Sequence, residues 1–236
     1  MRTVVVSGEA LATPELTLTG EAYRHLFRSA RQARGDRLRL VDGCGTAREG
    51  EIVDVDRHQA MVRVGGPLPP NEPSLFVDLR VAAPKGNRAG WLVEKTTEMG
   101  VGAVRFFRSG RGPRSYGTST LGRLQRVARS AVEQSHRSRV PRVEGMLELR
   151  ACLADLRPGA AFHLDPGATA SWPRDLPSSV VVMVGPEGGF RRAELEALEG
   201  AGSTGVRLGA TVLRVETAAV AAVACLLQAA PGRWGE

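Results

Sequence analysis

The chain has 236 residues, of which 42% are hydrophobic and 24% charged, an ordinary balance for a globular fold of one or two domains. Its longest strongly apolar stretch, residues 218–230, is too short to cross a bilayer, and its first residues lack the apolar core of a signal peptide, so we expect a cytoplasmic protein. The three cysteines and four histidines stand apart, without metal-ligand spacing, which argues against a disulfide framework and against a metal site.

Arginine is concentrated in two stretches of the chain, whose net charge is +7. Residues 24–39 hold six Arg and one acidic residue, and residues 105–142 hold ten Arg and one acidic residue. Basic stretches with so few acidic neighbours favour contact with a nucleic-acid backbone. The alternative is a pair of solvated faces neutralised by counter-ions.

The N-terminal part of the chain predicts a small β-barrel. Several of its short runs alternate apolar with polar residues, and strands are expected at residues 2–6, 15–19, 37–42, 50–56 and 60–65. Residues 20–36, rich in Ala, Arg and Leu, are expected to form a short amphipathic helix. Small barrels of this kind often bind RNA, but the fold alone does not establish that function.

Residues 65–74 predict a linker. They hold four Pro and two Gly, a composition that excludes a helix or a central strand. The linker divides the chain into an N-terminal domain of residues 1–70 and a C-terminal domain of residues 71–236.

The C-terminal part predicts an α/β fold with a parallel sheet. Strands are expected at residues 75–84, 102–107, 160–165, 179–185 and 205–209, and helices at residues 90–100, 119–137, 191–200 and 215–230. Apolar strands that alternate with helices are typical of a parallel sheet covered on both faces. The last helix is apolar nearly all round, so we expect it to be buried or to lie at a subunit interface.

Three loops follow predicted strands at the carboxyl ends, where open α/β sheets bind their ligands. They are residues 163–167, 184–189 and 208–218. The second reads Val184-Gly-Pro-Glu-Gly-Gly189. It has the shape of a phosphate loop, but it lacks the Lys-Ser/Thr ending, and Glu187 would repel a pyrophosphate. From these residues alone, a structural turn and a loop for another ligand both remain open.

Five ordered segments of the chain resemble the RsmE family, the small-subunit ribosomal RNA methyltransferases E of the SPOUT class. Residues 185–190 (GPEGGF) and 208–218 (LGATVLRVETA) are similar to the two C-terminal motifs of that class. Further similarity lies in residues 94–101, residues 131–141 and the N-terminal part. The matching positions there are Lys95, Glu98, Gly100, Glu133, Gln134, Arg137, Pro141, His25, Gly35, Asp36, Asp42 and Gly43.

The resemblance implies a fold, a reaction and partners. The fold is a PUA-like, RNA-binding β-barrel at residues 1–70 and a SPOUT methyltransferase domain at residues 71–236 with a C-terminal trefoil knot. The cofactor is S-adenosylmethionine. The reaction is methylation at N3 of one uridine of 16S ribosomal RNA, uridine 1498 in the standard RNA numbering. The partners are that RNA or the assembled small subunit, together with a second copy of the chain in a homodimer, and neither a membrane nor a metal is expected.

The resemblance also implies site residues. Apolar side chains and glycine amides of the three loops would bind the cofactor: Leu164, Val184, Gly185, Pro186, Gly188, Gly189, Leu208, Gly209, Val212 and Leu213. For catalysis, Arg214 would stabilise charge on a uracil oxygen and Glu216 would act as a base or orient Arg214. Glu187 would lie near the cationic sulfonium. For Arg214 and Glu216 the alternative is a helix-start pair without a catalytic role.

The expected RNA contacts lie in the basic stretches. They are Arg24, His25, Arg28, Arg31, Arg111 and Arg137. The sequence departs from the family pattern at residues 28–31 and at residues 110–112. The first departure affects how the barrel would grip RNA, and the second affects any role that needs a carboxylate beside Arg111.

Other functions remain as alternatives. Within the same class, the chain could methylate a 2′-hydroxyl of ribose, or it could be a non-catalytic RNA-binding module that keeps the fold. A nucleotide-dependent enzyme of another class is disfavoured because the phosphate-loop motif is missing.

Overall fold

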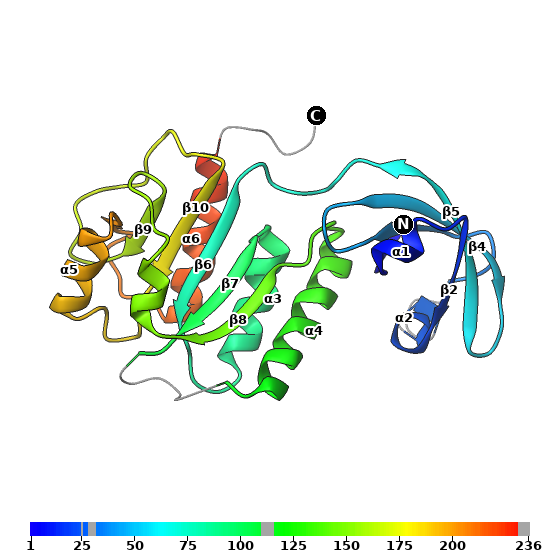
Figure 1. Cartoon of the computed structure of the whole chain (residues 1–236), viewed down its shortest axis with the longest axis horizontal. Coiled ribbons are helices and arrows are strands. Elements are labelled where there is room, and N and C mark those ends of the chain that lie inside the picture. Colours follow the sequence, from blue (N-terminus) through cyan, green and yellow to red (C-terminus); the bar gives the residue numbers. More distant parts are fainter. Residues whose placement is uncertain (25, 28–31, 110–115, 231–236) are drawn as a thin grey trace. The chain divides into compact units, whose positions relative to one another are not determined.

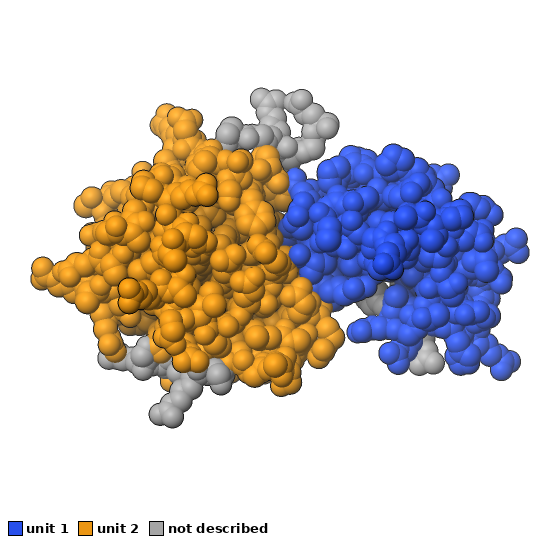
Figure 2. Space-filling view, viewed as in Figure 1, with its two compact units in different colours: residues 1–72, 129–140 blue, residues 73–128, 141–236 orange. Residues whose placement is uncertain are grey.

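The computed structural model describes residues 1–24, 26–27, 32–109 and 116–230, and these residues form two compact units (Figures 1 and 2). Unit 1 comprises residues 1–72 and 129–140, and unit 2 comprises residues 73–128 and 141–236. The sequence-based domains, 1–70 and 71–236, are contiguous, whereas unit 1 also includes a short segment from the middle of the chain.

Unit 1 is built on a curled five-stranded sheet, the form that the predicted small barrel takes. Its strands lie in the order β1 (Arg2–Val5), β3 (Arg37–Val41), β4 (Ala47–Val55), β5 (Gln59–Leu68) and β2 (Glu15–Thr19). β1 and β3 are parallel, and the other pairs are antiparallel. Alternate residues of β2 and β5 are buried, as the alternating pattern predicts, and pack into a core with Leu26, Leu38 and Ile52.

Two short helices accompany this sheet in the part of the chain that the structure describes. α1 (Gly8–Leu11) was not predicted; it begins after Ser7, whose side chain accepts a hydrogen bond from the amide of Ala10. α2 (Gly20–Arg24) is the beginning of the predicted helix at residues 20–36.

The predicted linker at residues 65–74 is corrected in its first half. β5 continues through Gly65, Gly66 and Pro67 to Leu68, where it pairs with the beginning of β4. β2 pairs only with residues 59–63 of β5, so among the described strands this end of β5 pairs with β4 alone. A proline is tolerated there because an edge position does not require its missing amide hydrogen.

The segment of residues 129–140 is held in unit 1 by apolar and polar contacts. Val132 is fully buried in a cluster with Val5, Val41 and Ala47. The carboxylate of Glu133 accepts a hydrogen bond of 3.0 Å from the amide of Val5. The hydrogen bond joins residues that lie 128 positions apart in sequence.

Unit 2 is built on a six-stranded sheet in which every pair of strands is parallel, as predicted. The order is β11 (Thr204–Val206), β9 (Ala161–Leu164), β10 (Ser179–Val184), β6 (Phe76–Ala82), β7 (Ala103–Phe107) and β8 (Arg142–Leu147). β8 was not predicted. The 3₁₀ helix η2 (Leu149–Leu153), which follows it, was not predicted either.

Helices cover the sheet of unit 2. α3 (Arg88–Met99) packs against α6 (Val215–Ala229), and α6 lies along β6 and β10 (Figure 1). α4 (Thr118–Ser135) contacts β8, where Leu121 lies against Gly145. η2 and α5 (Arg192–Gly200) contribute to an apolar cluster with Ala82, Phe107 and Met183. The last helix was expected to be buried or to lie at a subunit interface, and eight of its fifteen residues are buried.

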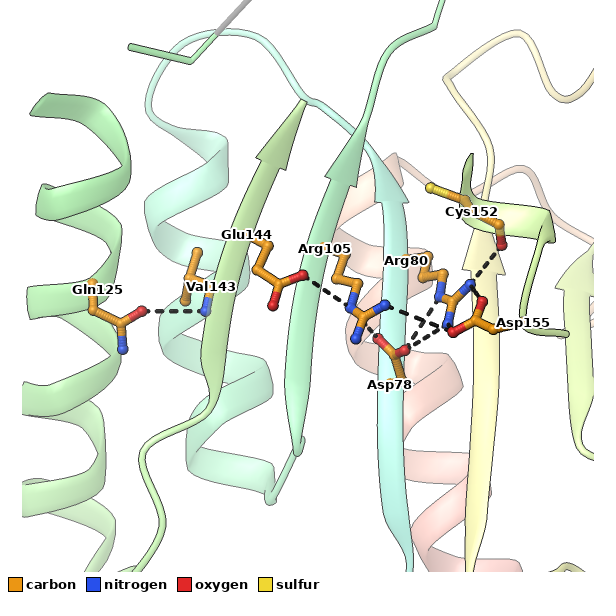
Figure 3. Close-up of polar contacts among 8 residues, drawn as sticks. All are labelled: Asp78, Arg80, Arg105, Gln125, Val143, Glu144, Cys152 and Asp155. Atoms are coloured by element: carbon orange, nitrogen blue, oxygen red, sulfur yellow. Dashed lines mark hydrogen bonds and ion pairs between the residues drawn. The ribbon is translucent and has the colours of Figure 1, made fainter. Parts of the chain in front are cut away.

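A network of charged side chains runs across β6, β7 and β8 (Figure 3). Arg80 of β6, only 1% exposed, donates hydrogen bonds to Asp78, to Asp155 and to the carbonyl oxygen of Cys152. Arg105 of the neighbouring strand lies 3.5 Å from Asp78 and 3.2 Å from Glu144. The network therefore ties β6, β7, β8 and the segment after η2 together.

Among the residues that the structure describes, no helix is long and apolar enough to span a membrane. The same residues contain no group of His, Cys, Asp and Glu side chains that could hold a metal ion.

Candidate active site at the carboxyl ends of three parallel strands

One pocket lies where β9, β10 and β11 end. The three strands are parallel and in register, with Val206 opposite Leu164, so the loops that follow them start at the same edge of the sheet. The amide of Asp165 donates to the carbonyl oxygen of Val206, which joins two of the loops. The pocket has about 610 Å³ of empty space, its open mouth included.

Most of the predicted cofactor residues line this pocket. The structure brings together Leu164, Val184, Gly185, Pro186, Gly189, Leu208, Gly209, Val212 and Leu213, with Glu187. Gly188 instead lines an adjoining hollow with Ser109, Arg191 and Glu194. Further lining residues were not predicted: Asp165, Pro166, Val206, Arg207, Thr211, Val215 and Ala218.

The glycine-rich loop after β10 has the backbone freedom that its sequence predicts. Gly189 has a φ of +72°, which L side chains rarely adopt, and its amide donates to Pro186 to close a tight turn. A Cβ atom at Gly185 would lie 3.1 Å from the ring of Phe190. Larger residues at these two positions would therefore strain the wall of the pocket.

Glu216 is a buried carboxylate at the start of α6. It is 8% exposed, and its Oε1 lies 3.6 Å from Nε of Arg88, the first residue of α3. Its Oε2 is buried and has no hydrogen-bond partner in the described part of the chain. Unsatisfied buried oxygens are rare in proteins, and one at a candidate site calls for a functional explanation.

Arg88 joins two of the predicted catalytic residues. Besides its ion pair with Glu216, it donates a hydrogen bond of 3.3 Å to Oε1 of Glu187 in the glycine-rich loop. One cation is therefore shared by a carboxylate of the glycine-rich loop and a carboxylate of the first turn of α6.

Arg214 lies apart from this group. It is the exposed residue that precedes α6, and its side chain forms no hydrogen bond or ion pair with any residue that the structure describes. The possibility that Glu216 orients Arg214 has no contact in its support, since Glu216 pairs with Arg88.

His163 lies behind the pocket on β9. It is fully buried, and its Nδ1 lies 3.0 Å from the hydroxyl of Ser203. Burial lowers the pKa of His163, against the opposing effects of Asp165 and Glu199. The imidazole is therefore neutral at pH 7, and it supports the strand from which Leu164 enters the pocket.

The predicted RNA contacts have different outcomes. Arg24 is exposed at the end of α2, whereas His25, Arg28, Arg31 and Arg111 lie outside the described residues, as does the departure at residues 110–112. Arg137 is only 3% exposed, and its guanidinium pairs with Glu72 at 2.6 Å. Its charge is paired inside unit 1, so Arg137 is not proposed as an RNA contact.

Arg88 and its neighbours were missed by the sequence analysis. They belong to the segment Pro84-Lys-Gly-Asn-Arg88, which follows the carboxyl end of β6. The rule that selected the other three loops applies to this strand as well. A signal was therefore present, in the position of the segment and in its Lys-Gly-Asn-Arg composition.

Family models match both parts of the chain. Residues 71–227 match an RNA methyltransferase domain, and residues 18–64 match an RNA methyltransferase PUA domain. Fold and sequence together thus define an RNA methyltransferase that carries a PUA domain.

Relatives give the family more closely. Ribosomal RNA small subunit methyltransferase E of Mycobacterium bovis is 33% identical over 203 residues, 80% of this chain and 77% of that protein. The Bacillus subtilis protein of the same name is 26% identical over 90% of each chain. A solved structure of this enzyme from Neisseria gonorrhoeae, bound to S-adenosylmethionine, superimposes with a TM-score of 0.89 at 27% identity over 97% of both chains. The chain belongs to the ribosomal RNA small subunit methyltransferase E family.

Proposed function

We propose that the chain transfers the methyl group of S-adenosylmethionine to N3 of a uridine in 16S ribosomal RNA, uridine 1498 in the standard numbering. The observation that carries the proposal is the pocket formed by the three loops, in a chain whose relative from Neisseria gonorrhoeae is bound to that cofactor. The Arg-rich stretches support an RNA substrate.

The lining of the pocket fits S-adenosylmethionine. Leu164, Val184, Leu208 and Leu213 offer apolar walls for an adenine ring, and the loop glycines let backbone amides approach a ligand closely. Asp165 and Glu187 add carboxylates that favour a cationic ligand and disfavour a pyrophosphate. When bound, the cofactor supplies a methyl group on a positively charged sulfur.

Glu216 is the base in this proposal. Uridine N3 carries a weakly acidic proton, which must leave before the nitrogen electron pair can form a bond to the methyl carbon. Oε2 of Glu216, which has no partner, accepts that proton once the side chain of Arg88 moves aside. The side chain of Arg88 is 42% exposed, so it has room to turn from the carboxylates of Glu187 and Glu216 toward a uracil oxygen on which negative charge develops.

Arg214 and Glu187 have supporting roles. Arg214 is exposed and unpaired within the described residues, so it is available to a uracil oxygen or to a neighbouring phosphate. Glu187 lines the cofactor pocket and accepts a hydrogen bond from Arg88, so it connects the cofactor pocket with the pair of Arg88 and Glu216.

The remaining parts of the proposal concern the molecule as a whole. The chain is proposed to act in the cytoplasm as a homodimer, with a trefoil knot in the C-terminal domain. The parallel sheet and the apolar α6 are compatible with this arrangement.

The proposed reaction is tested by methylation of unmodified RNA in vitro. Small-subunit RNA from a strain that lacks its own enzyme is incubated with the purified chain and the labelled cofactor, and the product nucleoside is identified by mass spectrometry. We expect 3-methyluridine at a single position. A ribose-methylated product would identify the chain as a 2′-O-methyltransferase, and absence of label would contradict the proposal.

The homodimer is tested by light scattering. At micromolar concentration we expect a mass of twice 25.2 kDa. The mass of a single chain under these conditions would contradict this part of the proposal.

A further inference from the structure

A second hollow adjoins the cofactor pocket. It is lined by Lys85, Gly86, Asn87, Arg88, Trp91 and Glu187, and it contains about 1020 Å³ of empty space, open solvent included. Glu187 lines both this hollow and the cofactor pocket, so the two spaces adjoin at this residue. We propose that this hollow is the subsite for the target base, in which the extruded uracil stacks on Trp91; this inference rests on the proposed function.

Trp91 carries the stacking part of the inference. It lies in the first turn of α3 and is 44% exposed, one of few large hydrophobic side chains so exposed among the described residues. An enzyme that acts on a base must take the base out of its stack, and it holds the extruded base against aromatic or apolar side chains. An exposed indole beside the cofactor pocket provides that surface.

Polar groups around Trp91 fit a nucleotide. Lys85 is exposed and forms no ion pair with any described residue, so its ammonium is free for a phosphate that flanks the base. Asn87 precedes α3, but its side chain does not cap the helix, which leaves the amide free to donate to a uracil oxygen.

The same surroundings argue against a protein partner at this position. The cores of protein interfaces are depleted in charged residues, whereas Trp91 shares its hollow with Lys85, Arg88 and Glu187. A single aromatic side chain among cations and a glycine fits a base with its phosphate better than it fits the apolar face of a second copy.

The inference is tested with three variants and one control. Trp91→Ala removes the ring, Trp91→Phe keeps an aromatic face, and Lys85→Gln removes the free charge. Lys95→Gln is the matched control, because it removes a charge from the same region but that ammonium is already paired with Glu94 and Glu98. The KM for small-subunit RNA, kcat, and the Kd for S-adenosylmethionine by calorimetry are measured for each protein.

We expect Trp91→Ala to raise the KM for RNA about tenfold, the size of one base–aromatic stack. Trp91→Phe should restore most of this loss, and the Kd for the cofactor should stay within twofold. Lys85→Gln should weaken RNA binding and lower its salt dependence, whereas Lys95→Gln should leave both unchanged. An unchanged KM in Trp91→Ala, a weakened cofactor Kd, or a change of oligomeric mass would each overturn the inference.

Direct RNA binding separates this inference from the proposed function. Fluorescence anisotropy with a labelled 16S RNA fragment that contains uridine 1498 requires no turnover. If the wild-type chain transfers no methyl group, the proposed function fails, while a loss of affinity in Trp91→Ala still supports a base subsite. Equal affinities of the wild type and Trp91→Ala would refute the subsite even if methyl transfer occurs.

Discussion

At the scale of single residues, the carboxylate of Glu216 is the most informative group of the candidate site. It is buried, it is paired on one oxygen with Arg88, and its other oxygen has no partner. A neutral amide in its place keeps the shape of the side chain but cannot accept the proton of uridine N3. We therefore expect Glu216→Gln to lower kcat by about 10²–10⁴-fold, as for the loss of a general base, with little change in the Kd for S-adenosylmethionine.

The control for Glu216→Gln is Glu187→Gln, which also removes a carboxylate that pairs with Arg88. Glu187 lines the cofactor pocket, so its loss should weaken cofactor binding more than it lowers kcat. Single-turnover rates and calorimetry measure the two effects separately. If both variants lose the same parameter, the distinct roles assigned to the two carboxylates are wrong.

The pKa of His163 makes a separate prediction about stability. Burial lowers this pKa in the folded protein, so between the folded value and the unfolded value of about 6.5 the unfolded chain binds more protons. The free energy of unfolding should therefore be constant well above pH 6.5 and fall as the pH decreases through that value. Urea unfolding from pH 8 to pH 5 measures this slope.

His163→Asn should reduce the slope, although it lowers the absolute stability. His136, whose pKa is also lowered by burial, is present in both proteins, so its contribution cancels in the comparison. An identical pH dependence in the wild type and the variant would contradict the assignment.

Sequence reasoning predicted the candidate site unevenly, for a physical reason. The three loops follow apolar strands that can be recognised in the sequence. Because ligands bind at the carboxyl ends of such strands, the position of these loops predicts a site without reference to their own side chains. The pairing of Glu216 with Arg88 joins residues 128 positions apart. Patterns of helices, strands and turns relate only residues that are close in sequence, so the partner of Glu216 could be identified only from the structure.

At the scale of elements, apolar runs predicted the central strands and failed at one edge of the sheet. After Ser179, β10 is a continuous run of Val and Met with neighbours on both sides. β8 is one of the two edge strands; it contains Gly145 and charged residues, and most of it is only partly buried. An edge strand needs fewer apolar residues because it is not enclosed on both sides, so its sequence resembles that of a loop.

The charged network of Figure 3 gives a prediction at this scale. Burial alone would lower the pKa of Arg80, but hydrogen bonds and charges from Asp155 and Asp78 outweigh it and raise the pKa above its usual value. Arg80→Met would leave the buried Asp78 with only the more distant Arg105. We expect the free energy of unfolding to fall by about 3–5 kcal/mol, the cost of breaking a buried pair on one side. Urea unfolding at pH 7 measures it.

Two comparisons control this prediction. Arg192→Met breaks an exposed pair with Glu196 and should change the stability by less than about 1 kcal/mol. The hydrogen bond to Arg80 is the main cause that lowers the pKa of Asp155, and this side chain is more than half exposed. Asp155→Asn should therefore also lower the free energy of unfolding only slightly. The effect should be present above the unfolded pKa of about 3.9 and disappear in acid. Equal losses in all three variants would mean that burial does not set the cost.

At the scale of the whole molecule, the two compact units do not correspond to two pieces of sequence. Residues 129–140 belong to unit 1, although they follow more than fifty residues of unit 2. Periodicity predicted the helix of which residues 129–135 are part, and burial of Val132 follows from its apolar face. That this face packs against Val5, Val41 and Ala47 could not be predicted, because an apolar stripe does not specify what covers it.

A fragment of residues 73–236 tests the consequence of this division. The fragment keeps every residue that lines the cofactor pocket, but it removes the partners of Val132 and Glu133 in β1, β3 and β4. We therefore expect it to bind S-adenosylmethionine, while residues 129–140 lose protection from amide hydrogen exchange and the fragment associates through the exposed apolar side chains. Hydrogen exchange read by mass spectrometry compares this segment in the fragment and in the full chain.

Val132→Ser tests whether the association of the fragment is caused by its exposed apolar side chains or by another effect of the truncation. In the full chain the substitution should lower the free energy of unfolding by about 1–3 kcal/mol, because Val132 is fully buried there. In the fragment it should instead reduce association, because the same side chain would face solvent. Protection of residues 129–140 that is equal in the fragment and in the full chain would show that unit 2 alone holds this segment, and the division into units would then have to be redrawn.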